Sequence, residues 1–257
     1  MAAPTTILVT GASGGIGAAI AEHVAAPGVR VALFARRRDQ LEAVAGKVQQ
    51  KGAEALVLVG DVADLASVEK AWGELVAKWG SSLDFAYLNA GTGGVFPLKK
   101  FKAERVRHIF EVNVLGVVNW LHFLLPPMLE ARRGTIVGVS SLAAQRGGPG
   151  AGAYSASKAA VTNLLESIRL EARRSNVRVC TVEPGFVRTD MTAANKFPMP
   201  FMVEPAEAAR VICRGAQCGC SMIRFPWPLQ AGMALMRWMP NWLYDRVSGS
   251  MLGQDSD

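Results

Sequence analysis

The 257-residue sequence predicts an α/β fold in which a doubly wound parallel sheet of about seven strands carries helices on both faces. Two observations support this prediction: short apolar runs recur along the chain, and segments with helical periodicity separate them. Half of the residues are hydrophobic, which is enough to bury a large core. The expected strands are 7–10, 30–35, 54–60, 84–90, 134–140, 177–183 and 220–225.

A single domain is expected to span residues 1–257, because no repeat, low-complexity stretch or long linker divides the sequence. Residues 185–225 should supply the substrate lid and the last strand, and residues 226–257 form an apolar C-terminal tail. The first strand begins almost at the N-terminus, so no signal peptide is expected. The sequence contains no uninterrupted apolar run of about 18 residues, so no membrane span is expected.

The composition indicates a cytoplasmic protein with reduced thiols. Four cysteines are too few and too clustered for a disulfide framework, and the three histidines do not suggest a metal site. The net charge of +7 is spread over small clusters without interleaved aromatic residues, which argues against nucleic-acid binding. Peripheral association with a membrane is the alternative location.

A glycine-rich turn, TGASGGIG at 10–17, follows the first apolar run and opens an amphipathic segment. Strand, glycine turn and helix in this order are the context that a phosphate-binding loop requires. Gly11 allows a tight turn, Gly15 lets the backbone approach a pyrophosphate, and Gly17 lets the helix pack close to the strand. A turn without a ligand is the simpler alternative, but the flanking elements favour a Rossmann-type dinucleotide-binding fold.

Tyr154 and Lys158 lie four residues apart in a helical segment, and Ser141 precedes Tyr154 by 13 positions. Positions i and i+4 share a helix face, so the ammonium group can lie beside the phenol. A free phenol has a pKa of about 10 and is a poor acid or base at neutral pH. A neighbouring cation lowers that pKa, which suits Tyr154 for proton transfer.

Together these motifs resemble the short-chain dehydrogenase/reductase family from about Thr5 to Thr189. The resemblance rests on TGxxxGxG at 10–17, Asp61-Val62, Asn89-Ala90-Gly91, Asn113, Ser141, Tyr154 with Lys158, and Pro184-Gly185. It implies an oxidoreductase that transfers a hydride between a nicotinamide cofactor and a carbonyl or secondary alcohol.

The resemblance also implies roles for individual residues. Tyr154 is the expected acid/base, Lys158 lowers its pKa and reaches the nicotinamide ribose, and Ser141 binds the substrate oxygen. Asn113 should disturb its helix and hold a water, unless it only caps a local bend. Simple turn roles are the alternatives for Asp61 and Asn89. The expected cofactor contacts are Gly11, Ser13, Gly15, Ile16, Gly17, Asp61, Val62, Asn89, Ala90, Gly91, Tyr154, Lys158, Pro184, Gly185, Val187 and Thr189.

The end of the second expected strand distinguishes between the two nicotinamide cofactors. Ala35 occupies the place where an NAD enzyme carries a ribose-binding carboxylate, and Arg36, Arg37 and Arg38 follow. A guanidinium binds a 2′-phosphate through charge-assisted hydrogen bonds. NADP(H) is therefore expected, held by Arg36 with Arg37 as second candidate, and NAD(H) is the alternative. Gly14 stands where NADP-using members of the family often carry a basic residue.

The substrate is expected to be apolar, because the lid segment 186–203 is rich in Met and Phe. The residues concerned are Met191, Phe197, Met199, Phe201 and Met202. A lipophilic ketone or alcohol is the favoured substrate. The alternative is a 3-oxoacyl thioester on an acidic carrier protein, which Arg132, Arg133, Arg173 and Arg174 could dock. An alternative of another class is a non-catalytic NADPH-binding sensor or scaffold.

Two further surfaces are expected to make contacts. The helical segments 104–128 and 152–174 carry apolar residues on more than one face, which predicts a homodimer or homotetramer. The tail contains Trp227, Trp238 and Trp242, and Pro228 and Pro240 should bound a short helix within it. We expect the tail to cover the substrate pocket or a partner subunit, with contact to a membrane interface as the alternative.

Overall fold

The computed structural model describes residues 4–96, 98–193, 195 and 197–249. All seven expected strands form one sheet in the order β3-β2-β1-β4-β5-β6-β7, and every neighbouring pair is parallel. The predicted fold class is therefore confirmed. The strands are β1 Thr5–Thr10, β2 Val29–Ala35, β3 Glu54–Val59, β4 Phe85–Leu88, β5 Thr135–Val139, β6 Arg178–Pro184 and β7 Met222–Phe225.

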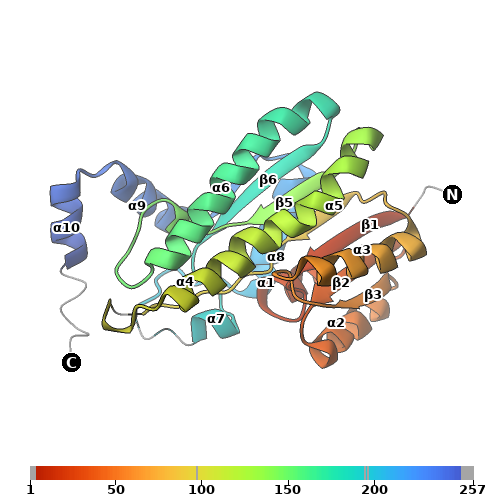
Figure 1. Ribbon diagram of the computed structural model, residues 1–257, viewed down its shortest axis with the longest axis horizontal. Coiled ribbons are helices and arrows are strands. Elements are labelled where there is room, and N and C mark those ends of the chain that lie inside the picture. The colour runs from red at the N-terminus through yellow and green to blue at the C-terminus, as the bar shows by residue number, and fades with distance from the viewer. Residues whose placement is uncertain (1–3, 97, 194, 196, 250–257) are drawn as a thin grey trace.

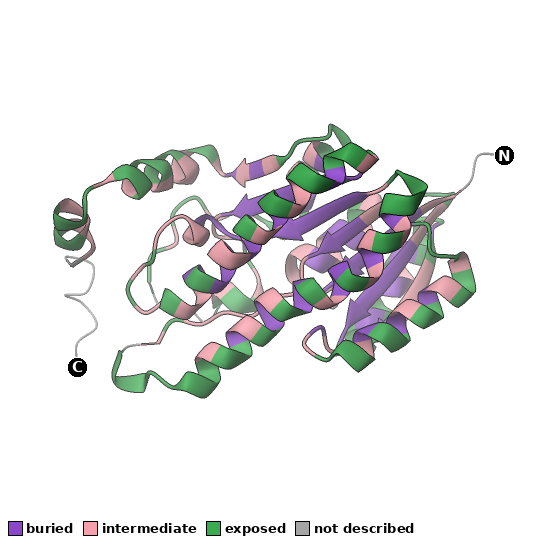
Figure 2. Cartoon of the chain, turned by 45° about the horizontal axis from the view of Figure 1, so that its top comes forward, coloured by how far each residue is buried: buried purple, intermediate pink, exposed green. Residues whose placement is uncertain are grey.

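Helices cover both faces of this sheet (Figure 1). They are α1 Gly15–Val24, α2 Arg38–Gln50, α3 Leu65–Trp79, α4 Ala103–Phe110, α5 Gly116–Ala131, α6 Gly152–Ala172, α7 Asp190–Ala193, α8 Pro205–Gln217, α9 Trp227–Trp238 and α10 Asn241–Gly249, with short 3-10 turns at η1 Leu98–Lys100, η3 Leu142–Ala144 and η4 Arg173–Ser175. α1, α2 and α8 bury one apolar cluster, and α3, α5 and α6 bury the other. The central strands are mostly buried between these two layers (Figure 2).

α4 and α5 belong to one helical stretch, Ala103–Ala131, which a π-helical turn, η2 Glu111–Leu115, interrupts. By length and composition this stretch could cross a membrane, although the sequence analysis expected no such segment. However, 44% of its most apolar window is buried, because side chains such as Trp120 and Leu124 pack into the core. This burial is typical of the core helix of a globular protein.

Half of the eight apolar residues that α5 and α6 were expected to offer to a partner subunit are buried inside the subunit instead. Val117, Trp120 and Leu121 of α5 and Leu165 of α6 are buried, whereas Val118 is 39% exposed. These helices therefore expose less surplus apolar surface than the sequence indicated. A homodimer or homotetramer stays an expectation.

The order of the strands creates the crevice in which a site can form. β1 and β4 are neighbours, but their connections lead to helices on opposite faces of the sheet. A crevice therefore opens between their carboxyl ends. Gly11 directly follows β1 and Asn89 directly follows β4, so the glycine turn and the Asn89-Ala90-Gly91 motif meet there.

The tail extends from the end of the sheet, beyond the edge strand β7 (Figure 1, blue). The expected helix between Pro228 and Pro240 is present as α9, and α10 follows it. Both helices are largely exposed in the view of Figure 2.

Candidate active site

One cleft at the carboxyl ends of the strands brings almost all of the predicted site residues together. Its volume is about 590 Å³. Of the predicted residues, Gly17 and Asn113 do not line it but lie directly behind residues that do. The predicted residues in its lining are Gly11, Ser13, Gly15, Ile16, Arg36, Arg37, Asp61, Val62, Asn89, Ala90, Gly91, Ser141, Tyr154, Lys158, Pro184, Gly185, Val187 and Thr189.

Three glycines of the turn leave no room for a side chain: Gly11, Gly15 and Gly17. Gly11 has a φ of +67°, and a Cβ there would lie 2.9 Å from the Cα of Ala90. A Cβ on Gly17 would overlap the carbonyl oxygen of Gly11, so this glycine allows α1 to start directly behind the turn. A Cβ on Gly15 would lie 2.9 Å from Cγ2 of Thr189. The turn therefore presents bare backbone at the N-terminus of α1, which fits a dinucleotide pyrophosphate.

Thr10 ties the two strand ends together, a role that the sequence analysis missed. Its buried hydroxyl accepts hydrogen bonds from the backbone N–H groups of Asn89 and Ala90, both at 3.0 Å. In return, the Asn89 side-chain amide donates to the carbonyl oxygen of Thr10 at 3.1 Å. The turns after β1 and β4 are thus held in a fixed relative position before any ligand binds.

Ser141, Tyr154 and Lys158 line the cleft where β5 ends and α6 begins. Lys158 is buried, and its Nζ donates to the carbonyl oxygen of Val139 at 2.8 Å, while lying 5.9 Å from the centroid of the Tyr154 ring. Burial lowers the pKa of Lys158 to about 8.

The pKa of Tyr154 is raised from its ordinary value, in contrast to the expectation from its lysine neighbour. Burial of the phenol causes the rise, and a hydrogen bond with the Ser141 side chain opposes it. Lys158 does not offset the effect of burial, and its ammonium donates to the carbonyl oxygen of Val139. At neutral pH Tyr154 is therefore a protonated phenol that can donate a proton.

Asn113 lies within the π-helical turn, so the helix is disturbed at this residue as the resemblance implied. It is fully buried, and its amide contacts both backbone groups of Thr92. Its Nδ2 also donates to the Ser157 hydroxyl at 2.9 Å. A Cβ on Gly91 would lie 3.2 Å from both Asn113 Oδ1 and Lys158 Nζ. Asn113 thus supports the loop after β4 from behind, next to the buried lysine.

Arg36 and Arg37 both reach the far end of the cleft, but they have different partners. Arg36 Nη1 lies 3.7 Å from Asp61 Oδ2. Arg37 Nη2 donates to Ser13 Oγ at 3.2 Å, which places its guanidinium beside the glycine turn. The second candidate of the sequence analysis therefore lies closer to the phosphate-binding turn than the first.

Glu183 is a buried carboxylate that the sequence analysis did not select, although an acidic residue in an apolar strand was a visible signal. It is 1% exposed and lies at the end of β6. Arg224 Nε and Gln145 Nε2 donate to its Oε2 at 2.7 and 3.0 Å, and the Thr162 hydroxyl donates to its Oε1 at 3.3 Å. Glu183 therefore connects β7, α6 and the segment after Ser141.

The lid contributes less to the cleft than the sequence predicted. Of its five Met and Phe residues, Met191 lines the cleft, whereas Phe197 and Phe201 are 37% and 56% exposed. Val187 and Val203 pair at the base of the lid. Met191 is thus the one of these five residues in the lining of the cleft.

Arg132, Arg133, Arg173 and Arg174 lie on the wrong side of the sheet to dock a carrier protein at this cleft. They directly precede β5 and β6 and therefore lie near the amino ends of these strands. The cleft is at the carboxyl ends, because all strands run parallel. The docking face proposed from sequence is therefore not supported.

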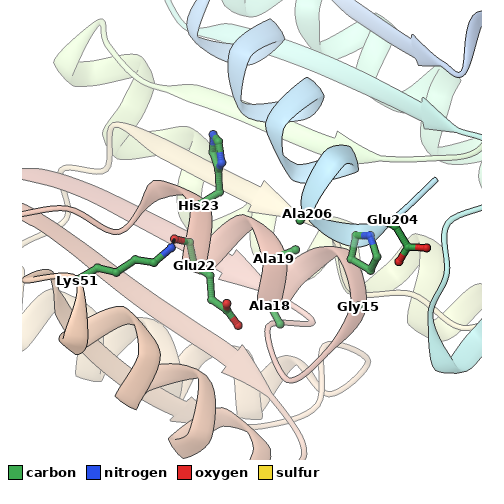
Figure 3. Close-up of a pocket in the computed structure, with 9 residues that line it drawn as sticks. Gly15, Ala18, Ala19, Glu22, His23, Lys51, Glu204 and Ala206 are labelled. Atoms are coloured by element: carbon green, nitrogen blue, oxygen red, sulfur yellow. Dashed lines mark hydrogen bonds between the residues drawn. The ribbon is translucent and has the colours of Figure 1, made fainter.

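A second hollow, of about 420 Å³, lies between α1 and the start of α8 (Figure 3). Its lining consists of Gly15, Ala18, Ala19, Glu22, His23, Lys51, Glu204, Pro205 and Ala206. It includes none of Ser141, Tyr154 and Lys158, so it is separate from the candidate catalytic residues. Within the described residues, no group of three or more His, Cys, Asp or Glu side chains is placed to hold a metal ion.

Comparisons with known proteins agree with this geometry. Residues 5–198 match the model of the short chain dehydrogenases. The chain is 41% identical over 243 residues to an uncharacterized oxidoreductase from Myxococcus xanthus, covering 95% of this chain and 96% of that protein. It is 36% identical over 188 residues to a 3-oxoacyl-[acyl-carrier-protein] reductase from Staphylococcus aureus, covering 73% and 76%. The solved alcohol dehydrogenase of the archaeon Thermococcus sibiricus, complexed with 5-hydroxy-NADP, has a TM-score of 0.77 at 29% identity, covering 86% and 95%.

Proposed function

The chain belongs to the short-chain dehydrogenase family of oxidoreductases, and we propose that it uses NADP(H) to interconvert a lipophilic ketone and its secondary alcohol. The observation that carries this proposal is the single cleft that holds two kinds of groups. Ser141, Tyr154 and Lys158 line it where proton transfer is needed, and Arg36 and Arg37 line it where a phosphate would bind.

The bound nicotinamide cofactor supplies or accepts the hydride. As negative charge develops on the carbonyl oxygen, Ser141 donates a hydrogen bond to it and Tyr154 donates a proton. The raised pKa of Tyr154 means that the phenol carries its proton at neutral pH before the reaction. In our assignment, Lys158 provides positive charge beside the phenol and stabilises the tyrosinate after proton transfer.

The preference for NADP(H) rests on the end of β2. In the described cleft, the position directly after Phe34 is Ala35, so no carboxylate at this point repels a 2′-phosphate. Arg37 has an exposed guanidinium beside Ser13, and Arg36 lies beside Asp61. The NADP derivative bound to the Thermococcus sibiricus enzyme supports the same assignment.

The second candidate function is reduction of a 3-oxoacyl thioester, which the Staphylococcus aureus relative favours. Against this candidate, the four arginines that could dock a carrier lie near the amino ends of the strands, opposite to the cleft. Met191 at the cleft favours an apolar substrate. A non-catalytic sensor is the least supported alternative, because Ser141, Tyr154, Lys158 and Asn113 are all present.

A two-part experiment tests the proposed function. Fluorescence titration compares NADPH and NADH binding, and NADPH oxidation is then followed with ketones of increasing chain length and with acetoacetyl thioesters. We expect tighter NADPH binding and a kcat/KM that rises with apolar area. Equal or tighter NADH binding contradicts the cofactor assignment. A flat chain-length series with good thioester turnover favours the second candidate, and no turnover on the whole panel favours the sensor.

A further inference from the structure

The solvent-facing side of α9 is apolar along its whole length, which is the reverse of an ordinary surface helix. Trp227, Leu235 and Trp238 are 77%, 70% and 84% exposed. Ala231 and Ala234 are exposed between them, and together these five residues lie on one face at helical spacing. We call this face the tryptophan stripe. The helix contains a single charged residue, Arg237.

The opposite side of α9 is fixed to the body of the protein, so the tryptophan stripe cannot simply turn inward. Leu229 packs on the turn after β6, where a Cβ on Gly185 would lie 2.6 Å from its Cδ2. Arg146 donates to the carbonyl oxygens of Met236 and Met239, both at 2.6 Å, and to Asn241 Oδ1 at 3.0 Å. The guanidinium of Arg146 thereby holds the C-terminal end of α9, and its exposed face stays outward.

A second exposed apolar segment lies at the same end of the molecule. Leu98 and Phe101 are 89% and 63% exposed, and the lysines Lys99, Lys100 and Lys102 stand beside them. Both Figure 1 and Figure 2 place the start of α4, which follows this segment, at the end where α9 and α10 project.

The loop after η3 connects the two apolar segments. The backbone N–H of Phe96 donates to the carbonyl oxygen of Gly150 at 3.1 Å. The Tyr244 hydroxyl of α10 donates to the carbonyl oxygen of Gly147 at 2.6 Å. Together with the bonds of Arg146 to the end of α9, these contacts join the tail and the chain just before Leu98 to the same loop. Thr92 and Gly93, which line the cleft, lie a few residues before Leu98 in the sequence.

We propose that this end of the protein is a binding surface for membranes that contain anionic lipids. The tryptophan stripe enters the interfacial layer, where Trp side chains are favoured. The basic residues at this end attract the lipid phosphates by their charge; they are Lys99, Lys100, Lys102, Arg237 and Arg246. Membrane binding would bring the protein to the layer in which a lipophilic substrate dissolves, a consequence that rests on the proposed function.

A lipid surface fits the tryptophan stripe better than a second copy of the chain. α9 has 12 residues, so its stripe is about 18 Å long and about 10 Å wide, or roughly 200 Å². A stable dimer needs about 800 Å² from each partner. Shallow insertion into lipid requires no complementary surface of that size.

Vesicle flotation of the full chain tests the proposal. The probes are vesicles of phosphatidylcholine alone and of phosphatidylcholine mixed with phosphatidylglycerol. We expect flotation with the mixed vesicles, reduced at high salt, and at least about a tenfold lower bound fraction for Trp227→Gln/Leu235→Gln/Trp238→Gln. The matched control Leu65→Gln/Leu170→Gln changes exposed leucines on α3 and α6 and should float like the unchanged chain.

The melting temperature of each variant checks that the fold is intact, and light scattering reports the oligomeric state. Failure of the unchanged chain to float with mixed vesicles overturns the proposal. Equal flotation of the triple variant and the unchanged chain also overturns it. If the unchanged chain does not bind vesicles and the triple variant has fewer subunits than the unchanged chain, the tryptophan stripe is assigned to contact with a second copy instead.

Discussion

Asn113 and Thr92 form a reciprocal pair in which one side-chain amide satisfies both backbone groups of a loop residue. Asn113 Oδ1 accepts from the Thr92 N–H at 2.7 Å, and Asn113 Nδ2 donates to the Thr92 carbonyl oxygen at 2.9 Å. The π-helical turn at Glu111–Leu115 places this amide toward the loop, which lines the cleft. The contact between Asn113 and Thr92 thus explains the π-helical turn.

Asn113→Asp is expected to destabilise the protein by about 1–3 kcal/mol at pH 7, because the carboxylate cannot donate to Thr92 or Ser157. The loss should shrink as the pH falls, since a protonated carboxyl can donate again. Urea melts at neutral and mildly acidic pH measure it. Asn119→Asp, which removes a single donation to Val62 in a less buried setting, is the matched control. Equal losses for both variants would contradict the special role of Asn113.

Tyr154→Phe is expected to lower kcat by about 10²–10⁴-fold, because it removes the proton donor. NADPH affinity should stay nearly unchanged, since the glycine turn and the arginines are untouched. Steady-state kinetics with a ketone that the enzyme reduces measure the change in kcat. A titration with NADPH measures the change in cofactor affinity. Activity within about tenfold of the unchanged enzyme would refute the assignment of Tyr154.

Arg37→Ala is expected to weaken NADPH binding by about 10–100-fold and to leave NADH binding unchanged, because a charge-assisted contact to the 2′-phosphate is lost. Arg36→Ala should act in the same direction but more weakly: each arginine has a carboxylate partner, but Arg37 alone of the two also bonds Ser13 of the glycine turn. Arg38→Ala is the control, because Arg38 pairs with Glu42 and does not line the cleft. If Arg38→Ala weakens NADPH binding as much as Arg37→Ala, the effect is only a general loss of charge.

Lys158→Met should abolish turnover and yet stabilise the fold at pH 7. Burial lowers the pKa of Lys158 from 10.5 to about 8, so between these values the unfolded chain binds more protons than the folded one. The contribution of this residue to stability is therefore lowest below pH 8 and rises with pH through that window. We expect a gain on the order of 1–3 kcal/mol at pH 7 that shrinks toward about pH 10. A gain in stability that does not change with pH would show that burial of the Lys158 charge is not what destabilises the fold.

Glu183→Ala is expected to cost about 3–5 kcal/mol of folding free energy, because it leaves the Arg224 guanidinium half-buried without its carboxylate. Glu207→Ala removes an ion pair with Arg210 that is exposed on both sides and should cost far less than Glu183→Ala. Chemical denaturation of both variants gives the comparison. Similar losses for the two would mean that burial of Glu183 adds nothing.

The strands and the glycine turn were predictable because their signals are local. Each buried parallel strand needs a short apolar run, and the turn needs glycines where φ is positive or a Cβ would collide, as at Gly11. The order of motifs then placed Ser141, Tyr154 and Lys158 in one cleft. These inferences depend on local sequence patterns and on the resemblance to the short-chain dehydrogenase/reductase family that the motifs carry.

What was missed depends on contacts between distant segments. The pKa of Tyr154 is raised because burial dominates, and burial of a phenol cannot be read from a four-residue spacing. Arg37, and not Arg36, reaches Ser13 because α2 begins at Arg38 and sets the direction of both side chains. The tail does not line the cleft within the described residues, because Arg146 fixes it elsewhere. Each of these facts follows from tertiary packing.

The buried pair of Glu183 and Arg224 also has a consequence for strand alignment. The two residues are direct partners between β6 and β7. A shift of β7 by one residue would turn the guanidinium to the other face of the sheet, and a shift by two would place Met222 or Pro226 opposite the carboxylate. This ion pair therefore holds β7 in one register against β6. Because α9 starts two residues after β7 ends, the ion pair also sets the point at which the tail leaves the sheet and the direction in which it leaves.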